Sequence, residues 1–201
     1  MLLPDTMTIH PSDLEIRRIV TDSDLDGVVT AAILRRWWTD AEVVFGHPGE
    51  LRAGVYDELI DEWTAICDLP VHPKCGLSID HHQSNRPEQN ETGAIVVWKD
   101  KPSAARIAFE LFHQIIDLSD LEGLLDWVDK IDSGSISKEE FLSNDPAIWL
   151  SRIVDSEEGT ASWILEQLRV GVSTEDILND SKISRLVSEK EEELELLNEI
   201  I

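Results

Sequence analysis

The chain has 201 residues, a length typical of one compact domain with a helical extension. Hydrophobic residues make up 42% and charged residues 29%, which excludes a disordered or collagen-like chain. With 17 Lys and Arg against 41 Asp and Glu, the formal net charge is −24, which argues against a broad basic surface for long nucleic acid. Two cysteines are too few for a disulfide scaffold or a four-thiolate zinc site.

The N-terminus predicts neither export nor a membrane anchor. Residues 1–5 contain no basic segment, and no stretch of the chain reaches the roughly 18 apolar residues of a membrane helix. Together with the low cysteine content, this favours a reducing, cytoplasmic location. The acidity is typical of an archaeal-like protein from a salt-adapted cytoplasm, although an ordinary acidic protein would have the same composition.

The first half of the chain alternates short apolar strands with helices, and the second half is helical. Strands separated by helices favour an α/β fold with a doubly wound, mainly parallel five-stranded sheet. The predicted strands are residues 16–21, 42–45, 65–67, 77–79 and 94–98. The predicted helices are residues 27–38, 56–63, 104–116, 119–130, 138–154 and 160–170.

Three parts of the chain follow from this pattern. Residues 1–135 form the α/β core, and residues 136–180 are helices that complete the domain. Residues 181–201 form an acidic amphipathic helix whose apolar positions approach a heptad seam. This last helix is predicted to lie on the surface of its own domain, to act as a linker, or to form an interface with a second copy or a partner chain.

Three carboxylates crowd the short loop after the first strand: Asp22, Asp24 and Asp26, followed by Gly27. Unless an oxygen-coordinating cation neutralises them, like charges this close repel and raise one another's pKa. An EF-hand is a poor alternative, because Ile33 stands at the twelfth position, where a calcium loop needs Glu. A purely structural acidic turn before a helix is a second alternative, but it leaves the acidic ends of other strands unexplained.

Two further strands end in possible metal ligands. Asp68 follows the third strand, and Asp80, His81 and His82 end the fourth. In a parallel sheet these ends lie along the same edge as the acidic loop, where such sheets bind ligands. Carboxylate and imidazole together suit manganese or a similar divalent ion. Two ions that share Asp68 would activate a water and clamp a phosphate.

The order and spacing of these residues resemble the first three motifs of the DHH phosphoesterase superfamily. The motifs are Asp22-x-Asp24-x-Asp26-Gly27, then Asp68, then Asp80-His81-His82. The family includes RecJ-like single-strand exonucleases, oligonucleotide and cyclic-dinucleotide phosphodiesterases, exopolyphosphatases and manganese-dependent pyrophosphatases. The three-aspartate loop is more similar to the RecJ-like branch. Asp132-Ser133-Gly134 fits the fourth motif, with Asp129 as the alternative, and the resemblance covers residues 16 to 134.

The resemblance implies two Mn²⁺ ions, with Mg²⁺ or Co²⁺ as alternatives, and an attack of metal-activated water on phosphorus. It implies that His82 faces the phosphate and that Asp80 orients the His81 ring. Asn85, Arg86 and Arg106 are expected to contact a second phosphate or the sugar, unless they are ordinary surface residues. The implied metal ligands are Asp22, Asp24, Asp26, Asp68, His81 and Asp132.

The chain departs from the family in two ways. Residues 69–79 are too few for a helix that many members place between the second and third motifs, and no room remains for the usual DHHA1 substrate-binding domain. The predicted function is a manganese-dependent phosphohydrolase that cleaves phosphodiester or phosphoanhydride bonds of nucleotides or short single-stranded oligonucleotides. The alternatives are a non-catalytic metal- or nucleotide-binding subunit acting with a partner chain, and an inorganic pyrophosphatase or polyphosphatase.

Overall fold

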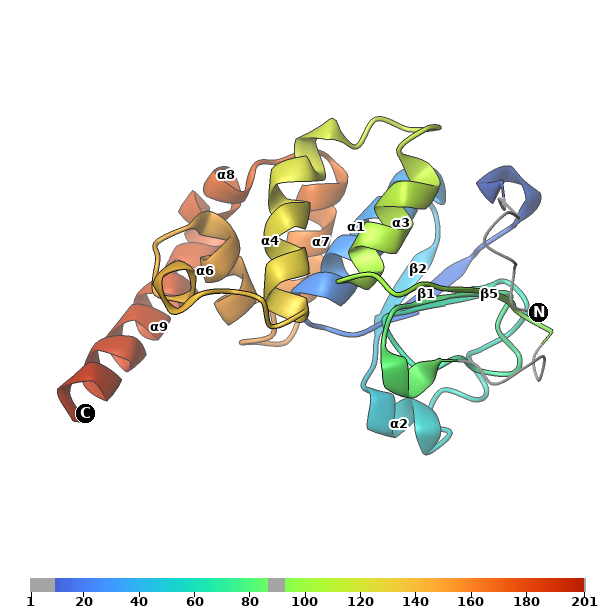
Figure 1. Cartoon of the computed structure of the whole chain (residues 1–201), viewed down its shortest axis with the longest axis horizontal. Coiled ribbons are helices and arrows are strands. Elements are labelled where there is room, and N and C mark those ends of the chain that lie inside the picture. The colour runs from blue at the N-terminus through green and yellow to red at the C-terminus, as the bar shows by residue number, and fades with distance from the viewer. Residues whose placement is uncertain (1–9, 87–92, 201) are drawn as a thin grey trace.

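The computed structural model describes residues 10–86 and 93–200. In it a sheet of five parallel strands, in the order β2-β1-β3-β4-β5, is flanked by helices (Figure 1). This confirms the predicted α/β fold, and each strand begins within two residues of its predicted start. The strands are β1 (Arg18–Thr21), β2 (Glu42–Phe45), β3 (Thr64–Cys67), β4 (Leu77–Asp80) and β5 (Ile95–Trp98).

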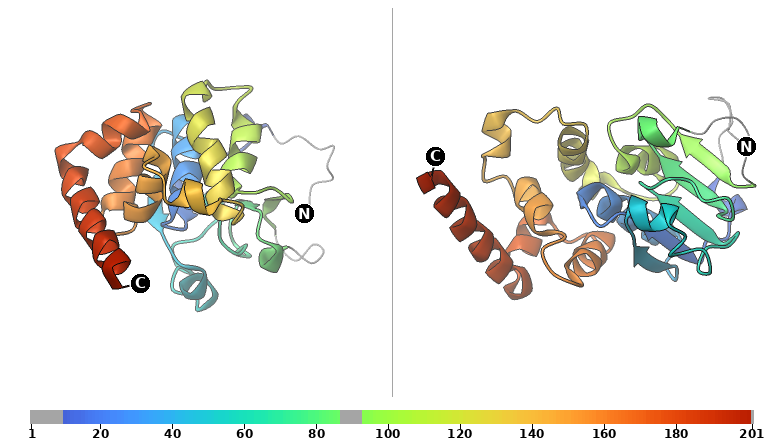
Figure 2. Two further views of the ribbon diagram at one scale, coloured as in Figure 1. Left: turned by 60° about the vertical axis from the view of Figure 1, so that its left-hand side comes forward. Right: turned by 90° about the horizontal axis from the view of Figure 1, so that it is seen from below.

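The two faces of the sheet are covered unequally. Side chains alternate along each strand, so Ile19 and Ala65 face one apolar cluster while Val20 and Ile66 face another. Helices α1 (Leu25–Trp37) and α3 (Ala104–Phe112) pack on the first face and against each other. The smaller cluster on the second face includes Leu51 of the short helix α2 (Pro48–Arg52). Figure 2 shows the long helices gathered on one side of the sheet.

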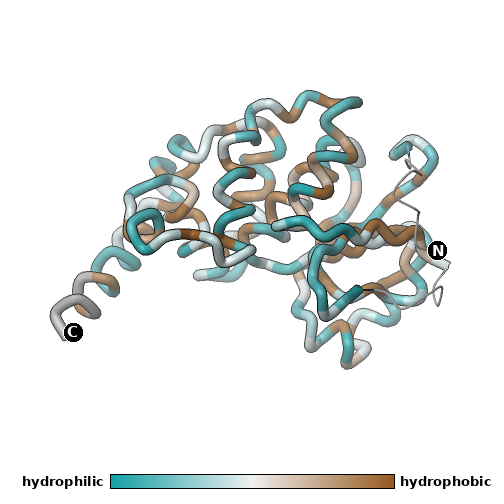
Figure 3. The backbone as a smooth tube through the Cα atoms, in the orientation of Figure 1, coloured by the Kyte–Doolittle hydropathy of each residue, from teal (hydrophilic) through white to brown (hydrophobic). Residues whose placement is uncertain are grey.

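The C-terminal helices share the main hydrophobic core with the sheet. Helix α7 (Thr160–Arg169) packs along α1. One apolar cluster runs from β1 and β3 through α1 and α7 into α6 (Pro146–Ile153) and α8 (Thr174–Asn179). Figure 3 shows hydrophobic segments recurring along the strands and the central helices. The helices after β5 and α3 are α4 (Glu122–Asp132), α5 (Lys138–Phe141), α6 (Pro146–Ile153), α7 (Thr160–Arg169), α8 (Thr174–Asn179) and α9 (Ser181–Ile200). The chain also has three 3₁₀ turns within the described residues: η1 (Pro11–Asp13), η2 (Gln83–Asn85) and η3 (Ser119–Leu121).

Helix α9 occupies the acidic C-terminal segment. Ile183 and Leu186 near its start are buried against the neighbouring helices. Its far end projects away from the body of the molecule, and Leu196 there is 61% exposed (Figures 1 and 2). The first half is therefore a surface helix on its own domain.

The predicted helix over residues 56–63 is wrong. The chain instead forms successive turns, because Gly54 adopts a left-handed φ of 78° and Ile60 bonds back to Tyr56 in a turn that does not continue. Leu59 is 43% exposed, so the apolar residues of this segment do not share one buried face. The regular helix lies earlier, at α2, where Pro48 occupies the first turn.

The predicted helix over residues 138–154 is two helices, α5 and α6. Asp145 caps the second by accepting a hydrogen bond from the backbone N–H of Ala147, and Pro146 begins it. Helix α3 also ends at Phe112, four residues before its predicted end. The predicted helix over 119–130 starts as the η3 turn and continues as α4 to Asp132.

Candidate metal centre

The ends of β1, β3 and β4 bring the predicted motifs to one edge of the sheet. The strand order 2-1-3-4-5 places the topological switch point between β1 and β3, the position at which open parallel α/β sheets bind ligands. Thr21 pairs with Cys67 in the register, so Asp22 and Asp68 leave neighbouring strands side by side. The N–H of Asp68 bonds to the carbonyl of Ile79, immediately before Asp80.

The acidic loop forms the tight turn from β1 into α1. Asp24 is the N-cap residue, and its carboxylate accepts a hydrogen bond from the N–H of Gly27 at 2.9 Å. A Cβ atom at Gly27 would lie 2.3 Å from the carbonyl oxygen of Asp22, so only glycine fits there. At the twelfth position of the alternative calcium loop, Ile33 is fully buried inside α1, which rules out an EF-hand.

The imidazole of His81 faces three carboxylates. Its Nε2 atom lies 3.0 Å from Asp132 Oδ2, 3.6 Å from Asp68 Oδ1 and 3.7 Å from Asp26 Oδ2. These residues come from four elements: β4's end, α4, β3's end and α1. The structure thus brings together side chains that are up to 106 positions apart, as the motif order predicts.

The orientation of the His81 ring fits a metal ligand. Its Nδ1 atom is 3.1 Å from the carbonyl oxygen of Lys101, which can only accept a hydrogen bond, so Nδ1 carries the proton. In the neutral ring Nε2 then directs its lone pair at the carboxylate oxygens. The lone pair and these negatively charged oxygens repel each other unless a cation binds between them.

Buried polar atoms without a hydrogen-bond partner also indicate a metal site. Among the described residues, few buried side-chain atoms lack a hydrogen-bond partner, and four of them belong to this cluster. They are Asp68 Oδ1, Asp80 Oδ2, His81 Nε2 and Asp132 Oδ2. The possible metal ligands form two groups that share His81: Asp26, His81 and Asp132, and Asp68, Asp80, His81 and His82. Within each group the ligand atoms lie within 4.8 Å of one another. A divalent cation with oxygen and nitrogen ligands suits this donor set.

Asp80 organises His82 rather than the His81 ring. Its Oδ1 atom accepts hydrogen bonds from the N–H groups of His81 and His82, at 2.8 and 3.0 Å, and lies 3.0 Å from Nδ1 of His82. The prediction that Asp80 orients the His81 ring is therefore wrong, because the Lys101 carbonyl holds that ring. The side chain of His82 is 43% exposed, and its Nε2 atom has no hydrogen-bond partner among the described residues.

Asp68 sits in a strained conformation. Its φ of 56° makes it the one non-glycine residue in the left-handed region within residues 10–86 and 93–200. Its side chain is almost completely buried, and Oδ1 is 3.4 Å from His82 Nδ1 as well as near His81. Strain of this kind is retained where a side chain must point in one direction, here into the cluster.

Crowding without a cation raises the pKa of the carboxyl groups. Desolvation, with the charges of Asp132 and Asp24, raises the pKa of Asp26 to about 7. Desolvation, with smaller contributions from Asp22 and Asp132, raises the pKa of Asp24 to about 6. Burial and the Asp26 charge also hold the pKa of Asp68 well above its usual range.

The same negative charges also raise the pKa of the two histidines, which favours their charged form. Burial opposes protonation of His81, but the contacts with Asp132 and Asp68 outweigh it and raise the pKa of His81 to about 11. The hydrogen bond with Asp80 raises the pKa of His82. Without metal, protons thus take the positions that a divalent ion would occupy.

Asp132 and Asp129, the two aspartates predicted as alternatives on α4, have different contacts. Asp132 points to His81, as described above. Asp129 turns away: its carboxylate accepts hydrogen bonds from Ser103 Oγ at 2.6 Å and from Arg106 Nε at 2.7 Å. Asp132 therefore joins the cluster and Asp129 does not.

The three predicted substrate contacts lie in different settings. Asn85 ends the η2 turn, which begins just after His82, and Arg86 is the residue that follows the turn. Asn85 accepts a hydrogen bond from Arg52 at 3.2 Å, and the guanidinium of Arg86 stacks on Trp98 at 4.9 Å. The guanidinium of Arg106, by contrast, is engaged by Asp126 and Asp129.

Several groups that shape the site are not predicted from the sequence. The Asp26 carboxylate accepts hydrogen bonds from the N–H groups of Ala104 and Ala105, both at 2.7 Å. The Lys101 carbonyl orients His81, and Arg52 contacts Asn85. Contacts made by backbone groups cannot be read from residue types. Ser103, a predicted N-cap residue, does indicate that the next N–H groups, those of Ala104 and Ala105, lie at a helix N-terminus and need acceptors.

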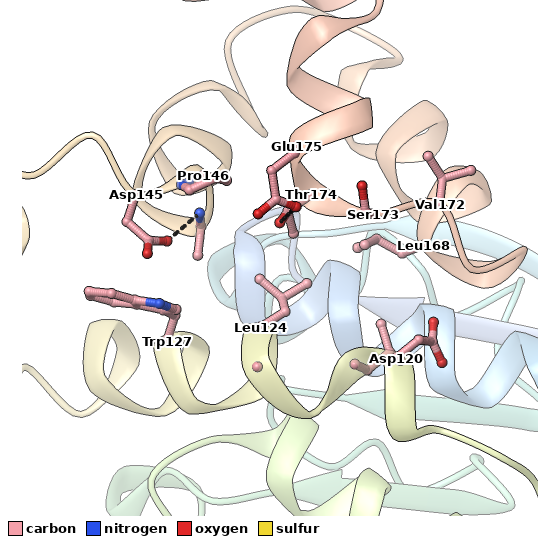
Figure 4. A pocket seen from close by; sticks show the side chains of 13 residues that line it. Asp120, Leu124, Trp127, Asp145, Pro146, Leu168, Val172, Ser173, Thr174 and Glu175 are labelled. Carbon is pink, nitrogen blue, oxygen red and sulfur yellow. Dashed lines mark hydrogen bonds between the residues drawn. The ribbon is translucent and has the colours of Figure 1, made fainter.

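A separate hollow of about 310 Å³ lies between α4, α6 and α8 (Figure 4). Trp127, Leu124 and Glu175 point into it, and none of the predicted site residues lines it. Asp145 at its edge caps α6, and Asp120 is paired with Arg36. These carboxylates are thus already used by the fold.

Comparison with solved structures finds the same fold in two hydrolases. The pGpG-specific phosphodiesterase PggH from Vibrio cholerae superposes with a TM-score of 0.71 and 24% identity, over 85% of this chain and 58% of that one. The exonuclease RecJ bound to manganese superposes with a TM-score of 0.54 and 16% identity, over 90% of this chain and 63% of that one. This chain therefore spans less than two thirds of either structure.

No protein-family model and no curated protein sequence matches the chain. The two structures therefore establish the fold and leave the chemistry to be argued from the residues of the site. Within the described part of the chain, no helix is both long and apolar enough to cross a membrane.

Proposed function

We propose that this protein is a DHH-type phosphohydrolase that uses divalent metal ions, Mn²⁺ first among them, to cleave phosphodiester bonds of nucleotides or short single-stranded oligonucleotides. The observation that carries the proposal is the group of buried, unpaired side-chain atoms at the switch point of the sheet, three of which, on Asp68, His81 and Asp132, belong to the proposed ligands. The shared fold with a pGpG phosphodiesterase and with a manganese-bound exonuclease supports it.

We assign the ligands to two ions that share Asp68. Asp26, His81 and Asp132 complete one set, because carboxylate oxygens of Asp26, Asp68 and Asp132 surround Nε2 of His81. Asp22 and Asp24, on the loop beside Asp68, complete the other. When bound, such a pair of ions activates a water and neutralises the charge on the phosphate oxygens.

His82 is assigned a proton-donor role. Asp80 holds Nδ1 of the ring and raises the pKa of His82, so the imidazolium persists to higher pH than in a free histidine. The open ring nitrogen is then a donor to a phosphate oxygen or to the leaving group. Asn85 and Arg86, three and four residues after His82, are assigned to a second phosphate or the sugar.

The test is nucleotide or phosphate release, with added Mn²⁺, from a panel of a 5′-phosphorylated dinucleotide, a single-stranded oligonucleotide, a cyclic dinucleotide and pyrophosphate. We expect turnover of the dinucleotide or oligonucleotide and its loss in Asp68→Asn. The control is Asp40→Asn, an exposed aspartate that precedes β2 and so lies at the edge of the parallel sheet opposite the site. Release from pyrophosphate alone would assign a pyrophosphatase. Mn²⁺ binding with no turnover of any substrate would assign a non-catalytic subunit.

A further inference from the structure

The N-terminal turn of α3 contacts both helices that carry metal-site aspartates. On one side, Asp26 of α1 accepts the N–H groups of Ala104 and Ala105. On the other side, the fully buried N-cap residue Ser103 donates its hydroxyl hydrogen to Asp129 Oδ1 on α4, at 2.6 Å. The α3 N-terminus therefore lies between the two helices and sets their separation.

Arg106 completes the contact with α4. Its Nε and Nη2 atoms lie 2.7 and 2.5 Å from Asp129 Oδ2, and Nη2 also donates to Asp126 at 2.8 Å. The side chain of Asp129 is only 15% exposed. Charge-assisted hydrogen bonds to a mostly buried carboxylate hold geometry better than an exposed ion pair does.

Asp129 and Asp132 lie three residues apart on α4 and therefore share a helix face. While Asp129 is held by α3, Asp132 places its unpaired Oδ2 atom 3.0 Å from His81 Nε2. A small rotation of α4 would move both carboxylates together, so a contact that fixes one of them fixes the other.

We propose that Ser103, Arg106 and Asp129 form a clamp between α3 and α4 that holds Asp132 in the metal site. Arg106 is thus a positioning residue that acts through Asp129, and it does not bind the substrate. This inference rests on the proposed metal centre. It replaces the expectation that Arg106 contacts a second phosphate.

The test measures Mn²⁺ binding by calorimetry in the substrate-free protein and, separately, kcat and KM at saturating Mn²⁺. We expect Arg106→Gln and Asp129→Asn each to raise the Mn²⁺ dissociation constant about tenfold, as loss of an outer partner of a ligand does. The double variant should bind no more weakly than either single variant, because both break one contact. KM should stay unchanged. Arg106→Lys, which keeps the charge but loses the fork, should lie between Arg106→Gln and the unmodified protein.

Arg169→Gln is the matched control, because it breaks an arginine–carboxylate pair within α7. A rise in KM for Arg106→Gln with unchanged Mn²⁺ affinity would overturn the clamp and restore the substrate-binding role. A lower melting temperature with unchanged Mn²⁺ affinity would overturn it in favour of a merely structural pair. If the unmodified protein binds no Mn²⁺, the proposed function fails first and the clamp fails with it.

Discussion

The metal-free protein should lose stability as the pH rises from 5 to 8. The carboxyl of Asp26 has a pKa of about 7 in the folded protein and 3.8 as its ordinary value, so the folded state holds a proton that the unfolded chain has released. The stability that this proton provides is fully present below pH 3.8 and is lost as the pH rises through about 7. Linkage gives a loss of about 3 kcal/mol between pH 5 and pH 8.

His81 acts in the same direction. Its pKa rises from 6.5 to about 11, so its contribution is fully present below pH 6.5 and is lost as the pH rises through about 11. For Asp26 alone, about 3 kcal/mol corresponds to a fall in melting temperature of about 6–12 °C in a chain of this size. Bound Mn²⁺ should abolish the fall, because the ion takes the place of the protons.

Thermal unfolding followed by circular dichroism, in EDTA and in saturating Mn²⁺, measures both effects. Asp132→Asn should flatten the fall in EDTA, because the Asp132 charge is the largest charge contribution to the raised pKa of Asp26. Asp40→Asn should leave it unchanged. A melting temperature in EDTA that stays constant or rises between pH 5 and pH 8 would refute the reasoning.

Three further substitutions test separate parts of the site. Gly27→Ala should lower stability by about 1–3 kcal/mol and weaken Mn²⁺ binding, because its Cβ would lie 2.3 Å from a carbonyl oxygen of the acidic loop. Gly123→Ala, where a Cβ meets open space in a helix, should raise stability by about 0.5–1 kcal/mol; a denaturant titration measures both glycine variants. His82→Gln should lower kcat about 10²–10⁴-fold and remove the alkaline limb of the pH–rate profile, while calorimetry shows Mn²⁺ still bound. Arg86→Gln should raise KM about tenfold with kcat unchanged, whereas Arg152→Gln, whose guanidinium stacks on aromatic rings of α5 and α6, should change neither.

The site could be assembled from the sequence because its ligands follow short apolar strands. The carboxyl ends of parallel strands lie along one edge of the sheet. The sequence alone therefore predicts that Asp22, Asp68 and Asp80 lie near one another. The choice between Asp129 and Asp132 was beyond the sequence. Both lie on the same face of α4, and only the side chains of α3 decide which one is already engaged.

The mistakes in the helical segments have a common cause. Apolar spacing over residues 56–63 and 138–154 is compatible with a helix, but local groups end it. Gly54 adopts a left-handed conformation, and Asp145 with Pro146 starts a new helix inside the second segment. Backbone donors and acceptors, such as the Lys101 carbonyl that orients His81, depend on where distant segments pack and leave no trace in composition.

The charge of the protein predicts how its substrate must bind. With a net charge of −24 and a site built from carboxylates, the metal-free protein repels a phosphate ester, so metal must bind before substrate. Added salt screens the remaining repulsion, since the Debye length falls from about 14 Å at 0.05 M to about 7 Å at 0.2 M. At saturating Mn²⁺, KM for a dinucleotide should therefore fall slightly or stay constant over this range. A protein that reads nucleic acid through a basic surface loses affinity by orders of magnitude under the same change. A steep rise in KM would show that an extended cationic surface, rather than a local metal centre with Arg86 beside it, attracts the substrate.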